Sequence, residues 1–166
     1  MATSAWSSSP LNVARGNALL AAACAAGALM LAGEAAVHIQ QFASLFHDVS
    51  WIGPLFLLNA ASCFAAIAAI AYPRTRQLAA LSGIVIAAIA LGSLVVSYGR
   101  GLFGWQEAGF RTPVELTVIA EVGSVVLLSL ALAIRAGLPS ANSAVAGAGR
   151  PVPCEPTIAS GGATAT

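Results

Sequence analysis

The residues of this chain that could carry chemistry gather in one short stretch, GEAAVHIQQFASLFHDVSW, at positions 33–51. It holds both histidines of the protein, His38 and His47, and two of the six acidic residues, Glu34 and Asp48. Glu34 and His38 are four residues apart, so on a helix their side chains share one face. Imidazole and carboxylate groups are common ligands of divalent transition metals, and two histidines could also be axial ligands of a haem. The stretch is therefore the first candidate for a functional site.

The composition places this candidate site in a membrane protein. Of the 166 residues, 58% are hydrophobic and only 8% are charged, and the mean hydropathy is +0.87. A soluble domain carries about 25% charged residues, so this chain has too little charge to cover a water-soluble surface. The sequence predicts an all-α, polytopic membrane protein whose main partner is the lipid bilayer. The net charge of +1 excludes the clustered basic face that a nucleic acid would need.

Four apolar segments are expected to form a four-helix transmembrane bundle within residues 18–135. Each has about 20 residues, which at 1.5 Å per residue spans a hydrocarbon core of about 30 Å. We expect the first to be retained and not cleaved, because its far end carries Glu34 and His38 in place of a small-residue cleavage site. The polar flanks 1–17 and 136–166 are expected to be disordered. The predicted helices are about 18–37, 52–72, 78–98 and 114–134.

The arginines predict an orientation, because positive residues concentrate in cytoplasmic segments. With a cytoplasmic N-terminus, five arginines lie inside and two lie outside, so we expect both termini to be cytoplasmic. The Ala-rich composition without lysine is typical of a bacterial protein, which indicates the bacterial cytoplasmic membrane. The inside set is Arg15, Arg74, Arg76, Arg135 and Arg150, and the outside set is Arg100 and Arg111.

This topology brings most of the remaining ionisable residues to the outer side of the membrane. Glu34 would lie about 6 Å inward of His38, and Glu121 about 9 Å inward of Glu115, so Glu34 and Glu121 could face each other at similar depth. Glu115 and Glu121 are about 120° apart on their helix, so we expect Glu121 in the bundle interior and Glu115 at the rim. The tentative metal or haem ligands are His38, His47, Glu34 and Glu121. The supporting polar cluster is Asp48, Tyr98, Arg100, Arg111 and Glu115.

A carboxylate inside a bilayer is costly, by about 2.5 to 3.5 kcal/mol for the most polar residues, so something must offset its burial. Three explanations remain open. The cluster could bind a divalent transition metal or a haem in an accessory, sensing or redox role. It could be a salt-bridge network, with Arg100 and Arg111 reaching the acids, inside a non-catalytic scaffold or assembly subunit. It could also be a proton or small-solute path in a homo-oligomer or membrane complex.

Other polar and aromatic residues have structural interpretations. Asn59 is expected to make a hydrogen bond between helices. Cys24 and Cys63 are expected to be small buried thiols, since the cysteine spacing indicates no disulfide framework. The chain has no nucleotide loop, nucleophile elbow or Ser/His/Asp set, so soluble-type enzyme chemistry is not indicated. The expected interfacial anchors are Trp51, Trp105, Phe103 and Phe110.

The chain resembles a group of small bacterial four-span membrane proteins of uncharacterised function. The features that carry the resemblance are the histidine pair of HIQQFASLFH, the GPLFLLN start of the second helix, the YGRGLFG exit of the third, and Glu121 in the fourth. The resemblance covers about residues 18–134. It implies a four-helix membrane protein and brings no established activity.

Overall fold

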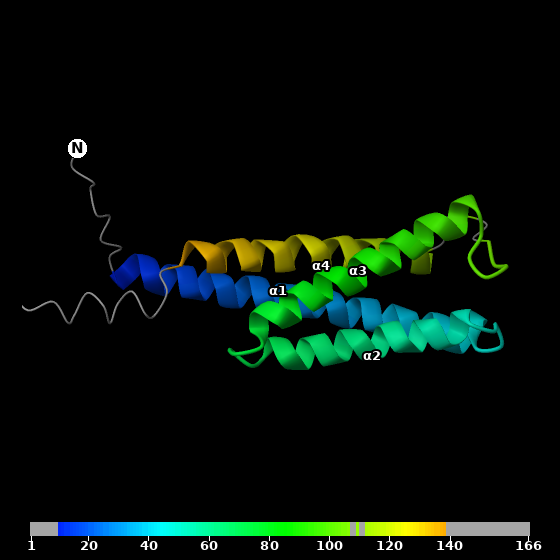
Figure 1. The fold of residues 1–166 in the computed structure, drawn as a ribbon, viewed down its shortest axis with the longest axis horizontal. Coiled ribbons are helices and arrows are strands. Elements are labelled where there is room, and N and C mark those ends of the chain that lie inside the picture. Colours follow the sequence, from blue (N-terminus) through cyan, green and yellow to red (C-terminus); the bar gives the residue numbers. More distant parts are fainter. Residues whose placement is uncertain (1–9, 107–108, 110–111, 139–166) are drawn as a thin grey trace, which may run out of the picture.

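The structure is a computed structural model that describes residues 10–106, 109 and 112–138 (Figure 1). In this part of the chain the fold has four long helices and no β-strand, and a short π-helix continues the first of them. Each long helix is long and apolar enough to cross a membrane, which confirms the predicted all-α, four-helix membrane fold. The elements are α1 (Pro10–Gln41), the π-helix η1 (Phe42–Phe46), α2 (Ile52–Ile70), α3 (Arg76–Gly99) and α4 (Thr112–Gly137).

The first helix is longer than predicted. It begins at Pro10, so residues 10–17 are helical and the expectation of a disordered arm over them was wrong. Proline suits a first helical turn because the amide hydrogen that it lacks would have no partner there. Leu138, just beyond α4, packs against Gly16, so this first part of α1 has a neighbour to pack on. Helix α4 likewise continues to Gly137, so the disordered tail expected from residue 136 was wrong for its first two residues. Residues 1–9 and 139–166 lie outside the described residues.

The helices form an antiparallel bundle in which α3 is the diagonal member (Figure 1). Helix α1 packs mainly on α4 and α2, and α3 packs on α4 and α2. Figure 1 shows α3 leaving α2 at the turn of residues 71–75 and crossing toward α4 at the opposite end of the bundle. We call that opposite end, which contains η1 and the connections 47–51 and 100–106, the histidine end. There α2 and α3 are spread apart.

The crossing of α3 over the α1–α4 pair depends on two glycines and one leucine. A Cβ at Gly27 of α1 would lie 2.5 Å from Cδ2 of Leu128, and a Cβ at Gly83 of α3 would lie 2.7 Å from its Cδ1. Leu128 of α4 is fully buried and fills the space that both glycines leave. Small residues at such points let membrane helices approach closely. We call this three-helix contact the Leu128 crossing.

Candidate functional site

A cavity of about 310 Å³ lies between α2 and α3, in the half of the bundle toward the histidine end. All four helices and the 100–106 connection contribute to its wall, which is mostly apolar. Two of its wall residues, Leu58 of α2 and Ile89 of α3, are 62% and 64% exposed, so they lie at an opening on the outer surface of the bundle. That surface is apolar and belongs to two membrane-spanning helices, so the cavity opens sideways, toward lipid.

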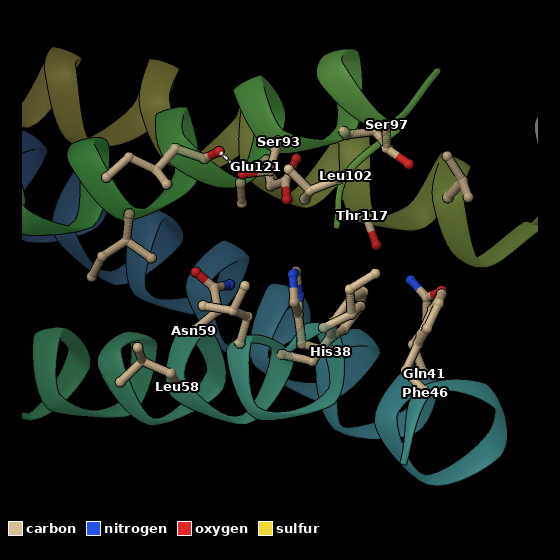
Figure 2. Close-up of a pocket in the computed structure, with 18 of the residues that line it drawn as sticks. His38, Gln41, Phe46, Leu58, Asn59, Ser93, Ser97, Leu102, Thr117 and Glu121 are labelled. Carbon is tan, nitrogen blue, oxygen red and sulfur yellow. Dashed lines mark hydrogen bonds between the residues drawn. The ribbon is translucent and has the colours of Figure 1, made fainter. Parts of the chain in front are cut away.

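Polar side chains from all four helices line this cavity (Figure 2). Figure 2 shows His38 of α1 and Asn59 of α2 on one side, and Glu121 of α4 opposite them. Glu121 is only 1% exposed, and its Oε2 atom is buried without a hydrogen-bond partner. An unpaired buried polar atom is rare in a folded protein, so the Oε2 atom of Glu121 needs an explanation.

A second carboxyl lies behind the cavity wall. Glu34 of α1 is fully buried, and the Nδ2 group of Asn59 donates a hydrogen bond of 2.8 Å to its Oε1 atom. The thiol of buried Cys63 also interacts with the Glu34 carboxyl. Glu34 and Glu121 lie close enough for their charges to interact. The hydrogen bond confirms the predicted interhelical role of Asn59.

The orientation of His38 is set by its own helix. Its Nδ1 atom is 2.9 Å from the backbone carbonyl oxygen of Glu34, which can only accept a hydrogen bond, so Nδ1 carries the hydrogen. In the neutral ring, Nε2 is then the acceptor. The ring packs on Phe56 of α2, with centroids 4.9 Å apart. His38 therefore offers the cavity one nitrogen with a free lone pair, opposite the carboxyl of Glu121.

An aromatic cluster, formed by Phe46, Phe56 and Trp105, lines the cavity at the histidine end. Phe46 stacks on Phe56 at 4.8 Å between centroids and meets Trp105 edge-on at 5.0 Å. The π-helix η1 brings Phe46 close to α2, where a Cβ at Gly53 would overlap the carbonyl oxygen of Phe46. Only glycine fits at this position. Gly53 is therefore the one sequence signal that could have indicated this contact.

The expected interfacial aromatics differ in position. Trp51 and Phe103 are 73% and 63% exposed, as interfacial anchors would be. Trp105 instead lines the cavity as part of the aromatic cluster. Its indole reaches inward because the 100–106 connection is a tight turn in which Leu102 and Trp105 exchange two backbone hydrogen bonds. Phe110 lies outside the described residues.

The second histidine is separate from the first. Nε2 of His47 lies 2.8 Å from Oδ2 of Asp48, and the two side chains are 53% and 88% exposed. Neither residue lines the cavity that contains His38. Among the described residues, no group of three or more His, Cys, Asp or Glu side chains is arranged to hold a metal ion. The metal or haem site built on both histidines therefore stays a prediction without support from the geometry.

The other described members of the predicted cluster do not line the cavity. Glu115 is exposed while Glu121 is buried, which confirms the predicted difference between the two acids. Arg100 is exposed, and Tyr98 is half-buried at the end of α3. The ion pair found in the described part of the chain is His47–Asp48, so no network joins Arg100 to the buried acids there. Arg111 lies outside the described residues.

Comparison with known proteins adds no further assignment. No family model matches the chain, and neither a curated protein nor a solved structure is significantly similar to it. The function therefore has to be inferred from the cavity and the groups that face it.

Proposed function

We propose that this protein binds a small lipophilic molecule within the bilayer, in the cavity between α2 and α3. The polar head of the ligand contacts Glu121 and His38, and its apolar body lies against α2 and α3. One observation carries the proposal: the carboxyl of Glu121 is buried, its Oε2 atom has no partner, and it lies in the wall of a mostly apolar cavity. Leaving such a group without a partner costs about 1–3 kcal/mol, so its retention is explained by a ligand that supplies the partner.

The shape of the cavity defines the size of the ligand and its path. Its volume of about 310 Å³ is at the lower end of the range of about 300–1,000 Å³ for small-molecule sites. A body of one or two rings, or a branched chain of similar size, suits it. Because Leu58 and Ile89 are exposed at the opening and the aromatic cluster lines the histidine end, the ligand enters from the lipid.

We place the protein in the bacterial cytoplasmic membrane with both termini inside, which the arginine distribution supports. The cavity then lies in the outer half of the bilayer. Glu121 follows Thr112, the first residue of α4, by nine positions, or about 14 Å at helical rise. The ligand is therefore taken from the outer leaflet. Of the three explanations that the sequence left open, the small-solute path is the one most similar to this proposal.

Trp105 provides a direct test because it lines the cavity. In a Trp6→Phe/Trp51→Phe background it is the one remaining tryptophan, and 1-bromonaphthalene bound in the cavity should quench its fluorescence by contact with bromine. With the protein in lipid nanodiscs, we expect quenching that saturates as the probe is added. Quenching that rises linearly with probe concentration, as for probe dissolved in lipid, would contradict the proposal.

A matched pair of alanines on α3 separates binding in the cavity from nonspecific quenching. Ala90 lines the cavity, whereas Ala88 is exposed on the same helix and does not line it. Ala90→Phe should fill the space and weaken probe binding at least tenfold. Ala88→Phe adds the same side chain outside and should leave binding unchanged. Equal effects of the two changes would place the probe elsewhere.

A further inference from the structure

In the described part of the chain, two acids lie at and behind the cavity wall without a matching base. Glu34 and Glu121 are 0% and 1% exposed, and the two carboxyls lie near each other. The chain has no lysine, and among the described residues no arginine lines the cavity. A buried carboxylate without a counter-charge is strongly disfavoured, so each of these groups needs either a proton or a cation.

The described groups that face Glu121 do not supply that cation. From α1 come Glu34 and His38, and from α2 come Asn59 and Cys63. The side chains that α3 places in the same wall near Glu121 include the hydroxyls of Ser93 and Ser97, which carry no charge. His38 is the one group of this set that could become positive. It forms no ion pair with either acid, because the ion pair found in the described part of the chain joins His47 and Asp48.

The rest of the wall suits a positive charge as well. The rings of Phe46, Phe56 and Trp105 line the cavity beside His38. Aromatic faces attract ammonium groups, by about 2 kcal/mol or more where water is excluded. Aromatic rings together with unpaired carboxyls are the groups that recognise a tertiary or quaternary ammonium ion with an apolar body.

We infer that the ligand is a lipophilic monocation and that it exchanges for one proton of the Glu34–Glu121 pair. This inference rests on the proposed cavity site. In the empty site both carboxyls hold their protons. When a monocation binds, the O–H bond of one carboxyl breaks, its proton passes to bulk water, and the carboxylate pairs with the cation. One positive charge enters and one leaves, so the net charge inside the bundle does not change.

The exchange has a definite pH dependence. Because binding releases one proton, linkage requires the apparent affinity for the cation to rise tenfold for each unit of increase in pH, over the range in which the empty site is protonated. An uncharged ligand of the same shape displaces no proton, so its affinity does not change over that range.

Two isosteric probes separate these cases. Benzyltrimethylammonium and neopentylbenzene have the same shape and differ in one atom, the charged nitrogen in place of carbon. We would titrate each into the full-length protein in nanodiscs, following heat and, in a weakly buffered solution, the release of protons with a pH-sensitive dye. We expect about one proton to be released per bound benzyltrimethylammonium and none per bound neopentylbenzene. At pH 8 the cation should bind at least tenfold more tightly than neopentylbenzene.

Variants on α4 identify the carboxyl that responds. Glu121→Gln keeps the size of the side chain but cannot become negative, so we expect at least tenfold weaker cation binding without proton release. Its affinity for neopentylbenzene should stay within threefold of the wild type, which shows that the cavity is intact. Glu115→Gln is the matched control on the exposed side of the helix and should behave as wild type.

The outcomes distinguish this inference from the proposed function. If neopentylbenzene binds as tightly as the cation, or if the cation binds without releasing a proton, the exchange is wrong and the lipophile site stands. If neither probe binds, both are wrong. These results come from the wild-type protein, so they do not depend on the folding of any variant.

Discussion

Replacing Glu121 by methionine should make the protein more stable. The side chain is 1% exposed and its Oε2 atom has no hydrogen-bond partner, so the fold bears an uncompensated polar group at this position. Methionine has a similar unbranched length and adapts well to irregular interiors. The change removes the penalty of an unsatisfied buried polar group, which is about 1–3 kcal/mol. We expect the free energy of unfolding to rise by about that amount while binding of benzyltrimethylammonium is lost.

The stability can be measured by reversible unfolding in mixed micelles of increasing sodium dodecyl sulfate content, followed by far-ultraviolet circular dichroism. Glu115→Met is the control, because Glu115 is exposed in the first turn of α4. It should change stability by no more than about 1 kcal/mol, the size of a helix-dipole effect.

The sign of the effect tests the competing scaffold hypothesis. If Glu121 were one partner of a buried ion pair, for example with Arg111, removing it would leave the other charge uncompensated and cost about 3–5 kcal/mol. A loss of that size would refute the view that Glu121 is kept for a ligand. It would make the acid a structural element of the bundle.

Three further changes test other parts of the structure. Asn59→Leu removes the 2.8 Å hydrogen bond to Glu34 and should lower stability by about 0.6–1.7 kcal/mol in the same unfolding assay, whereas Ser62→Leu, which removes a bond within α2, should cost less. Gly27→Ala should cost about 1–3 kcal/mol because its Cβ would lie 2.5 Å from Leu128, while Gly92→Ala, with no atom within 4 Å, should be neutral or stabilising; equal effects would remove the basis of the Leu128 crossing. In a cysteine-free background, an impermeant maleimide added to intact cells should label Asp48→Cys and not Pro73→Cys, and the reverse pattern would invert the proposed orientation.

The membrane fold could be predicted from the sequence because composition and segment length decide it. Helix positions then followed to within a few residues for α2, α3 and the start of α4. The start of α1 was missed because Arg15 and Asn17 look like part of a polar arm, whereas in the structure both are exposed on a helix. Polar side chains can be exposed at the end of a helix, so polarity alone does not show where a helix begins.

The buried part of the site was also predictable, from helical geometry. The offset of about 120° between Glu115 and Glu121 correctly assigned one acid to the rim and one to the interior. Helical geometry could not predict whether His47 lies near His38, because that depends on the path of the chain after α1. The π-helix η1 turns the chain so that Phe46, and not His47, enters the bundle.

The cavity itself could not be predicted, because it results from the angle between two helices. Nothing in the sequence of α2 or α3 shows that they separate toward the histidine end. That separation depends on how closely α3 approaches the α1–α4 pair, which Gly27 and Gly83 permit and which Leu128 limits. The pattern of apolar residues in a sequence indicates which face of each helix is buried, but not the angle at which two helices cross.

The Leu128 crossing gives α3 the mechanics of a lever. Gly83 is the fulcrum, and Ser93 in the cavity wall is ten residues further along the same rigid helix, about 15 Å away at helical rise. A rotation of α3 by about 10° at the fulcrum would displace Ser93 by about 2.6 Å, since the displacement is the arm length times the sine of the angle. We therefore expect one methyl group added at Gly83 to change the width of the opening between α2 and α3 without contacting any residue that lines the cavity.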